Sequence, residues 1–472
     1  MTKFSTRLGL VWFCISLSSL ISNPQSILAE GFRVLDHGAA ATGQGAAFSA
    51  QADNPSAVHY NPAGMTQLKG IQFSAGTLLI GGSIEFKSAS GGKVDGDLGG
   101  SIANPPPSTL FLTAHLPALG LKDLPNWTVG VGVTSPFALK VDYPDNSDIA
   151  PVLTSAALPL IDIKPTVAYK LNDYIAIGGG LDIYTFASFL GEGHAELQQN
   201  AAPGNTFGIP AGTGLEANGK DTALGFNASV LWTPLRNAVG KPILNLGFVY
   251  RNGANLNLDG DFLANGAKVA DASTTIELPD VYTWAIAGWP IRNAQHEWKI
   301  EVDVEYADWT DLKDIDLQLS NFKNPNIPSG FRQTIPQPRN YGDAWIFMVG
   351  TEFKVLSPPA LPKWDVSLRA GYLRSETPVP SRDFDPSNPD ADFNAFSAGV
   401  GFMCHAPAKF LGVLPCDSLG AKAMGLDLAY QILLYQTRGI SNNRQLVNGV
   451  PVLNGEWDTT LHVGALSFRV NF

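Results

Sequence analysis

The sequence has no long hydrophobic run beyond its first thirty residues. A membrane-spanning helix needs roughly 18 to 20 apolar residues in succession, so the later chain is not expected to cross a membrane by helices. Charge is also scarce, at 15% of the residues, and a formal net charge of −11 disfavours nucleic acid as a partner. Such a composition leaves strands as the main elements to look for, because the strands of a barrel give only a weak hydropathy signal.

Cysteine is nearly absent. Cys14 lies in an N-terminal apolar run, and only Cys404 and Cys416 follow it. These two flank one connection between predicted strands, and an oxidising compartment permits a disulfide there; two unpaired thiols are the alternative. His405 beside them does not complete a zinc site, since further ligands are missing. We expect no metal and no cofactor.

Catalytic motifs are missing as well. The sequence contains no Gly-x-Ser-x-Gly and no His-Glu-x-x-His, and its seven histidines form no recognisable pattern with a serine. Gly43-Gln44-Gly45 is not a dinucleotide fingerprint, because no strand precedes it and the third glycine is absent. We therefore expect that the protein is not an enzyme, and an outer-membrane lipid hydrolase is the disfavoured alternative.

The first residues have the pattern of a signal peptide. Lys3 and Arg7 precede an apolar run from about Leu8 to Ile21, and a cut is predicted after Ala29. Residues 1–29 are thus predicted to be removed on export.

Beyond residue 70 the chain divides into fourteen β-patterned segments. In residues 297–306 every second residue is apolar and the intervening ones are charged, so a pleated strand places all the charge on one face. Aromatic residues such as Trp127, Trp232 and Trp364 stand at strand ends, where the girdles of a membrane barrel belong. The segments are predicted at 71–86, 108–117, 126–136, 158–171, 174–190, 221–235, 243–258, 276–291, 297–317, 341–356, 363–376, 392–404, 421–438 and 456–472.

Long polar connections alternate with short ones between these segments. This layout is typical of a bacterial outer-membrane barrel, which has an even number of antiparallel strands. We predict an all-β fold, a transmembrane antiparallel barrel over residues 71–472 in the outer membrane of a Gram-negative bacterium. A soluble β-sandwich explains single strands but not the alternation of loop lengths.

Residues 30–70 do not alternate and are rich in small side chains. About forty residues are too few for a stable separate domain. They are predicted to form an N-terminal hatch, or plug, inside the lumen of the barrel.

Several fragments resemble the FadL/TodX family of outer-membrane transporters for hydrophobic compounds, in family order across nearly the whole exported chain. They are Gly31-Phe32, 61–65 (Asn-Pro-Ala-Gly-Met), 133–139, 164–173, Leu278-Pro279-Asp280, Trp309-Thr310 and 377–380. The resemblance implies a fourteen-stranded barrel, plugged by a hatch, that takes up long-chain fatty acids or aromatic hydrocarbons. It also implies outer-membrane lipid and the barrel-assembly machinery as partners.

The resemblance implies a route as well. A lipophilic molecule enters a pocket above the hatch and leaves sideways where the third strand is kinked. Here that strand runs into Ser135, Pro136 and Phe137, and a proline removes a ladder donor; the competing interpretation is that Pro136 merely ends the strand. Asn61, Pro62, Ala63 and Gly64, at the junction of hatch and barrel, form the predicted gating motif.

The alternation of side chains along each predicted strand supplies candidates for the pocket. They are apolar residues at positions that are expected to face the lumen. They are Tyr184, Phe186, Tyr282, Trp284, Ile286 and Phe347. A slip of one residue in register would invert any of these assignments. A packed core against the hatch is the competing explanation for strands that are apolar on both faces.

One departure from the family bears on the substrate. Members that carry fatty acids place a lysine in a Lys-Asp-Ala stretch, which is Gly342-Asp343-Ala344 in this chain. Arg339 in the adjacent loop could contact a carboxylate instead. Fatty acids and neutral aromatic hydrocarbons therefore both remain candidates, and a general diffusion porin remains the alternative function.

Overall fold

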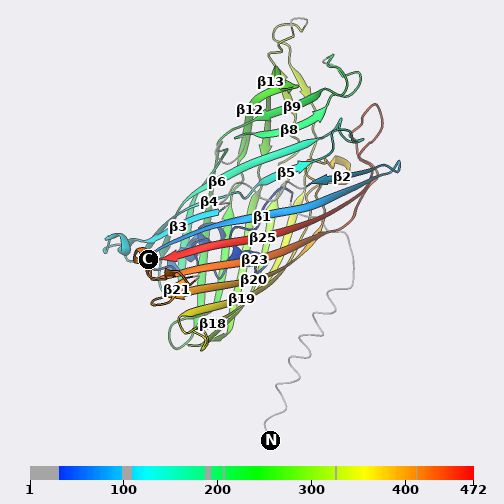
Figure 1. Ribbon diagram of the computed structural model, residues 1–472. Coiled ribbons are helices and arrows are strands. Elements are labelled where there is room, and N and C mark those ends of the chain that lie inside the picture. Colours follow the sequence, from blue (N-terminus) through cyan, green and yellow to red (C-terminus); the bar gives the residue numbers. More distant parts are fainter. Residues whose placement is uncertain (1–30, 98–108, 187–192, 206–207, 325–326, 411) are drawn as a thin grey trace.

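The computed structural model is a closed barrel of fourteen antiparallel strands (Figure 1). It describes residues 31–472 apart from 98–108, 187–192, 206–207, 325–326 and 411, so the predicted signal peptide lies outside the described residues. Each barrel strand pairs with the next, and β25 closes on β1 from Gln72↔Asn471 to Ser88↔Gly455. The barrel strands are β1 (Ile71–Ser88), β3 (Thr109–His115), β4 (Trp127–Thr134), β6 (Ser155–Lys170), β7 (Ile175–Phe186), β10 (Ala223–Arg236), β11 (Pro242–Arg251), β14 (Asp280–Arg292), β15 (His296–Asp308), β18 (Asp343–Leu356), β19 (Trp364–Ser375), β20 (Phe393–His405), β23 (Ala423–Tyr435) and β25 (Gly455–Asn471).

The predicted strand count and order are confirmed, and β10 shows why its sequence forms a barrel wall. Its exposed positions include Leu224, Phe226 and Trp232, whereas Asn227 and Ser229 face inward and are buried. An exposed apolar face with a buried polar face is the reverse of a soluble sheet and suits a wall between lipid and lumen.

The hatch segment, defined as residues 31–70, fills the lumen (Figure 1). It contains α2 (Ala39–Thr42), α3 (Ala57–Tyr60) and the 3-10 helix η1 (Pro62–Gln67). Most of its residues from Asp36 to Met65 are buried. Among the described residues, no helix is long and apolar enough to cross a membrane.

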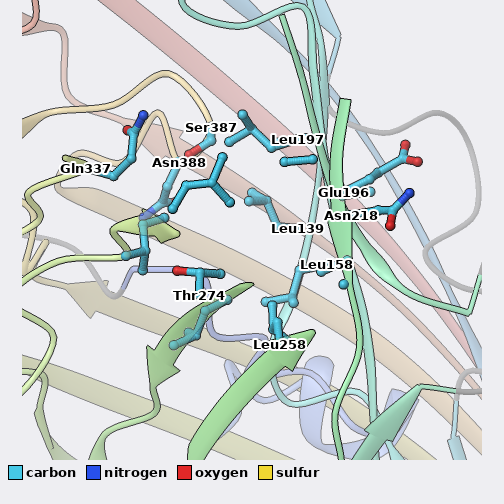
Figure 2. A pocket seen from close by; sticks show the side chains of 18 of the residues that line it. Leu139, Leu158, Glu196, Leu197, Asn218, Leu258, Thr274, Gln337, Ser387 and Asn388 are labelled. Atoms are coloured by element: carbon cyan, nitrogen blue, oxygen red, sulfur yellow. The ribbon is translucent and has the colours of Figure 1, made fainter. Parts of the chain in front are cut away.

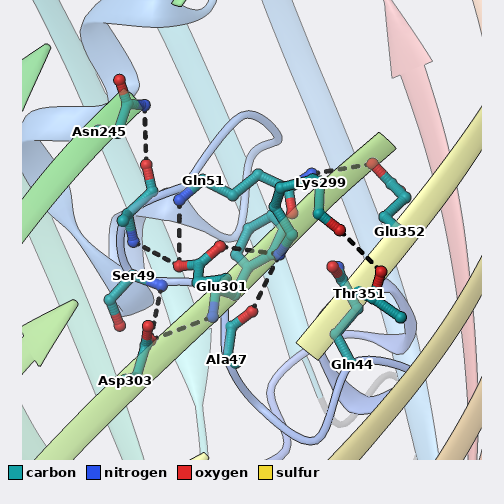
Figure 3. A network of polar contacts seen from close by, with 12 residues as sticks. Gln44, Ala47, Ser49, Gln51, Asn245, Lys299, Glu301, Asp303, Thr351 and Glu352 are labelled. Atoms are coloured by element: carbon teal, nitrogen blue, oxygen red, sulfur yellow. Dashed lines mark hydrogen bonds and ion pairs between the residues drawn. The ribbon is translucent and has the colours of Figure 1, made fainter. Parts of the chain in front are cut away.

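The charged face predicted for residues 297–306 is turned to the hatch segment (Figure 3). The Asp303 carboxylate accepts the backbone N–H groups of Phe48 (3.2 Å) and Ser49 (3.0 Å). The Glu301 carboxylate accepts that of Ala50 at 2.6 Å. These bonds satisfy buried backbone donors of a segment with little regular structure, and so they attach it to the wall.

The connections at one end, here called the loop end, are longer and form strands of their own. Residues 259–275 lie between two predicted strands and were expected to form a connection without strands, which is wrong. They belong to a hairpin of β12 and β13 whose turn is Asn265-Gly266, with positive φ at both residues. Asn-Gly favours that two-residue turn. The additional strands are β2 (Lys93–Asp97), β5 (Ala138–Asp142), β8 (Ala195–Asn200), β9 (Gly214–Gly219), β12 (Asn255–Ala264), β13 (Ala267–Glu277), β16 (Leu317–Ser320), β17 (Gln333–Ile335) and β24 (Arg438–Ile440).

Cys404 and Cys416 are joined by a disulfide, with their Cα atoms 5.8 Å apart. Both side chains are buried against Phe410 and Met424. The bond closes the connection between β20 and β23, which holds the short strands β21 (Lys409–Phe410) and β22 (Leu414–Pro415).

Candidate functional site: an apolar pocket beside the interrupted third strand

The third barrel strand is interrupted at residues 135–137. β4 ends at Thr134 and β5 begins at Ala138, and both pair with β6. Thr134 lies opposite Asp162, but Ala138 lies opposite Pro159, so the β4–β5 side has one extra residue. Pro136 has no N–H to donate, which is consistent with the break.

The hatch segment pairs with this break. The N–H of Val34 donates to the carbonyl oxygen of Pro136 at 2.9 Å, and the N–H of Ala138 donates to that of Phe32 at 3.1 Å. Arg33 and Phe137 form an antiparallel bridge between them. The start of the hatch segment is therefore held to the interrupted strand by backbone hydrogen bonds.

The predicted motif at residues 61–64 is buried at the other end of the hatch segment. The Asn61 side chain donates to the carbonyl oxygen of Ser49 at 2.8 Å and accepts the N–H of Ala63 at 3.1 Å. The N–H of Ala63 also donates to the Ser229 hydroxyl of β10 at 2.9 Å. Asn61 thus begins η1 and joins it to the rest of the hatch segment, while Ala63 joins it to the wall.

A pocket opens at the loop end, above the start of the hatch segment (Figure 2). Its empty volume is about 980 Å³, which includes solvent at its mouth. Leucines from separate elements form much of its wall, among them Leu139 (β5), Leu158 (β6), Leu197 (β8) and Leu258 (β12). Phe32 contributes from the hatch segment. A mainly apolar lining with a few polar groups suits a hydrophobic small molecule.

One part of the pocket is polar. Gln337, Arg339, Ser387 and Asn388 line it, and Figure 2 shows Gln337, Ser387 and Asn388 across the pocket from Leu158. The Arg339 guanidinium is buried and lies 3.3 Å from the Asp385 carboxylate. The pocket therefore has an apolar body and a polar end, where Arg339 is paired with Asp385.

Of the six predicted pocket residues, none lines this pocket. Tyr184 does point inward and is 1% exposed, and its ring lies 5.8 Å from that of Phe137 in the interrupted strand. Phe186 packs against the hydrophobic cluster that contains Tyr184 and Phe137. Tyr184 and Phe186 form packing beside the pocket.

For the other four, the expected inward orientation is wrong. Trp284 and Phe347 are each 44% exposed, and Ile286 and the half-buried Tyr282 share the outer face with Trp284. The inward positions of β14 hold Ala285 and Ala287, which pack against Ala50. Apolar residues stand on both faces because one meets lipid and the other meets the hatch segment, so polarity could not set the register. The competing explanation, a core against the hatch, is the correct one for Ile346 and Met348 of β18.

Sequence reasoning missed the pocket wall because β8, β9 and most of β12 and β13 fall in predicted connections, while residues 255–258 of β12 fall at the end of the predicted strand 243–258. The available signals were the Asn265-Gly266 turn and the alternation of Leu256 and Leu258 with polar residues. Arg339, which the sequence singles out as a possible contact for a carboxylate, does line the pocket.

The sequence profile of a protein family, described as outer membrane protein transport protein (OMPP1/FadL/TodX), matches residues 20–472. The chain belongs to this family. FadL/TodX proteins are outer-membrane transporters of hydrophobic compounds, and the fourteen-stranded barrel agrees with an outer-membrane location in Gram-negative bacteria.

Two curated relatives match the chain over about four-fifths of their own length. The long-chain fatty acid transport protein of Escherichia coli is 24% identical over 409 residues, covering 78% of this chain and 82% of the relative. That of Salmonella typhi is 22% identical over 401 residues, covering 78% and 83%.

Solved structures of the family share the fold. A Pseudomonas aeruginosa FadL homologue superposes with a TM-score of 0.68 at 18% identity, covering 94% of this chain and all of the other. The toluene transporter TbuX of Ralstonia pickettii superposes with a TM-score of 0.59 at 14% identity, covering 93% of this chain and all of TbuX.

Proposed function

We propose that this FadL/TodX protein takes up hydrophobic compounds, such as long-chain fatty acids or aromatic hydrocarbons, by binding them in the loop-end pocket and releasing them sideways at the interrupted third strand. The observation that carries the proposal is the pocket, with its leucine wall and the buried Arg339 at its polar end. An apolar chain or ring gains free energy by leaving water for such a wall.

Phe32 connects the pocket with the interrupted strand. It lines the pocket, and its ring centroid lies 6.1 Å from that of Phe137 and 4.8 Å from that of Trp309. Passage from the pocket to the wall at Ser135–Phe137 requires this aromatic group to move. The backbones of Phe32 and Val34 are hydrogen-bonded to the interrupted strand. Movement of the hatch segment would therefore be coupled to opening of that strand.

A diffusion porin is the less suitable function. The hatch segment occupies the lumen with mostly buried residues and is bonded to the wall on several strands. Diffusion of small polar solutes needs a continuous water-filled channel, whereas the lining of this pocket is mainly apolar.

Thr274→Trp tests the pocket, because Thr274 of β13 lines it and Thr275 does not (Figure 2). We expect Thr274→Trp to abolish binding and uptake of a radiolabelled long-chain fatty acid and of toluene. Thr275→Trp, on the exposed face of the same strand, is the matched control and should retain both. Equal binding and uptake by the two variants would place the substrate elsewhere.

A further inference from the structure

The hairpin of β8 and β9, at the edge of the pocket, carries a cluster of one histidine and two glutamates. Ala195, Glu196 and Leu197 of β8 and Asn218 of β9 all border the pocket. Alternation along β8 nevertheless places His194 and Glu196 on one face of the hairpin and Ala195 and Leu197 on the other. Glu196 pairs with Asn218 and Gln198 pairs with Glu216, which puts Glu216 diagonally across from Glu196 on the same face. Figure 2 shows the Glu196 carboxylate and the Asn218 amide directed away from Leu139.

The three groups are close enough to share an ion. One nitrogen of His194 and one carboxylate oxygen each from Glu196 and Glu216 lie within 4.8 Å of one another. The His194 Nε2 to Glu196 Oε2 distance is 3.8 Å. Ligand atoms around a tetrahedral zinc ion are about 3.4 Å apart, so side-chain movements of about an ångström would close the set.

Asn218 orients one of these ligands. Its Nδ2 donates to Glu216 Oε1 at 2.8 Å, while its Oδ1 accepts the N–H of Asp261 from β12 at 3.0 Å. The amide is therefore held by a neighbouring strand and fixes the direction of the Glu216 carboxylate. Such supporting hydrogen bonds are typical of groups that orient metal ligands.

We propose that His194, Glu196 and Glu216 bind a divalent transition-metal ion of the zinc class, with Asn218 as a positioning residue. One imidazole nitrogen and two carboxylates suit zinc and its neighbours better than calcium or magnesium, which prefer oxygen ligands alone. A cation also relieves the repulsion between two carboxylates at this separation. The ion would join β8 to β9 at the edge of the pocket, which both strands help to line. The metal site does not depend on what the pocket binds.

Zn²⁺ titration of the full-length protein in detergent, after treatment with a chelator, tests the site. We expect one Zn²⁺ per chain bound by these groups, an affinity loss of at least about tenfold in His194→Ala and in Glu216→Gln, and a loss of about tenfold in Asn218→Ala. Co²⁺ bound to the unmodified protein should give a visible ligand-field band that His194→Ala removes.

His115→Ala and Glu85→Gln, which change a histidine and a glutamate elsewhere on the surface, are the matched controls and should bind Zn²⁺ normally. Heat-dependent gel mobility establishes that each variant forms its barrel. The proposal is overturned if correctly formed His194→Ala binds Zn²⁺ as tightly as the unmodified protein, or if the controls lose as much affinity as the site variants.

Discussion

Gly178 of β7 lies directly against Pro62 of the hatch segment. A Cβ atom built on Gly178 would stand 2.5 Å from the Pro62 carbonyl carbon and 2.4 Å from the Ala63 nitrogen. Both are backbone atoms, so a side chain there could not be accommodated by rotation of a neighbouring side chain. The absence of a Cβ on the wall is what lets η1 approach it.

Gly178→Ala should therefore displace η1 while the barrel still forms. Overpacking of this kind costs about 1–3 kcal/mol, and we expect faster hydrogen exchange over residues 57–68. Gly288→Ala on β14 is the matched control, because a Cβ there would meet nothing within 4 Å. Unchanged exchange in Gly178→Ala would contradict the close contact.

The double change Asn61→Ala with Pro62→Ala should leave a heat-modifiable barrel but impair uptake of hydrophobic substrates. It removes the bond to Ser49 and leaves that buried carbonyl oxygen without its side-chain donor, at a cost of about 1–3 kcal/mol. Bulky residues introduced beside Pro136 should impair uptake in the same way.

Asn237→Ala is the control for this experiment, since its side chain accepts the N–H of Lys241 in a turn between β10 and β11. Normal uptake of a fatty acid and an aromatic hydrocarbon by a correctly assembled double variant would refute the gating role. Loss of the barrel would instead favour a role of the motif in folding.

Arg339→Gln should discriminate between substrate classes. A charge-assisted contact is worth about 1.5–3 kcal/mol, so a long-chain fatty acid should lose roughly 10- to 100-fold in affinity while toluene changes little. Equilibrium binding of both ligands is the measurement. Asp385→Asn is the partner variant, because it removes the anion 3.3 Å from the guanidinium and should not weaken fatty acid binding. Equal loss of both ligands in Arg339→Gln would indicate a structural role only.

The stability of the loop end should depend on pH through Asp390, which lies between β19 and β20. Burial raises the pKa of this carboxyl from 3.8 to about 7, although the Thr377 hydroxyl and the Gly31 N–H donate to it. A raised pKa means that the folded state prefers the protonated form. The stabilisation is therefore complete below pH 3.8 and is lost as the pH rises towards 7, by at most about 4 kcal/mol.

Asp390→Asn should remove this dependence. The measurement is the thermal midpoint of tryptophan fluorescence between pH 5 and pH 8, which Trp309 near the loop end should report. The variant should gain stability relative to the unmodified protein as the pH rises. A constant difference between the two across this range would exclude the assignment.

The barrel was predictable because its signals are local and repeated. Alternation in residues 297–306 places Glu301 and Asp303 on one face whatever the neighbouring strands are, and the even strand count follows from many such segments. Pro136 and the motif at residues 61–64 were identifiable for the same reason, since their backbone restrictions are properties of those residues themselves.

Only the tertiary structure determined what each face meets. Both faces of β14 are apolar, and the choice between lipid and hatch depends on Ala50 packing against Ala285 and Ala287 from a distant part of the chain. The pocket depends likewise on Leu139, Leu258 and Arg339 meeting across three connections. Alternation specifies the two sides of a strand but not which partner lies on each, because contacts between distant residues form only when the barrel closes.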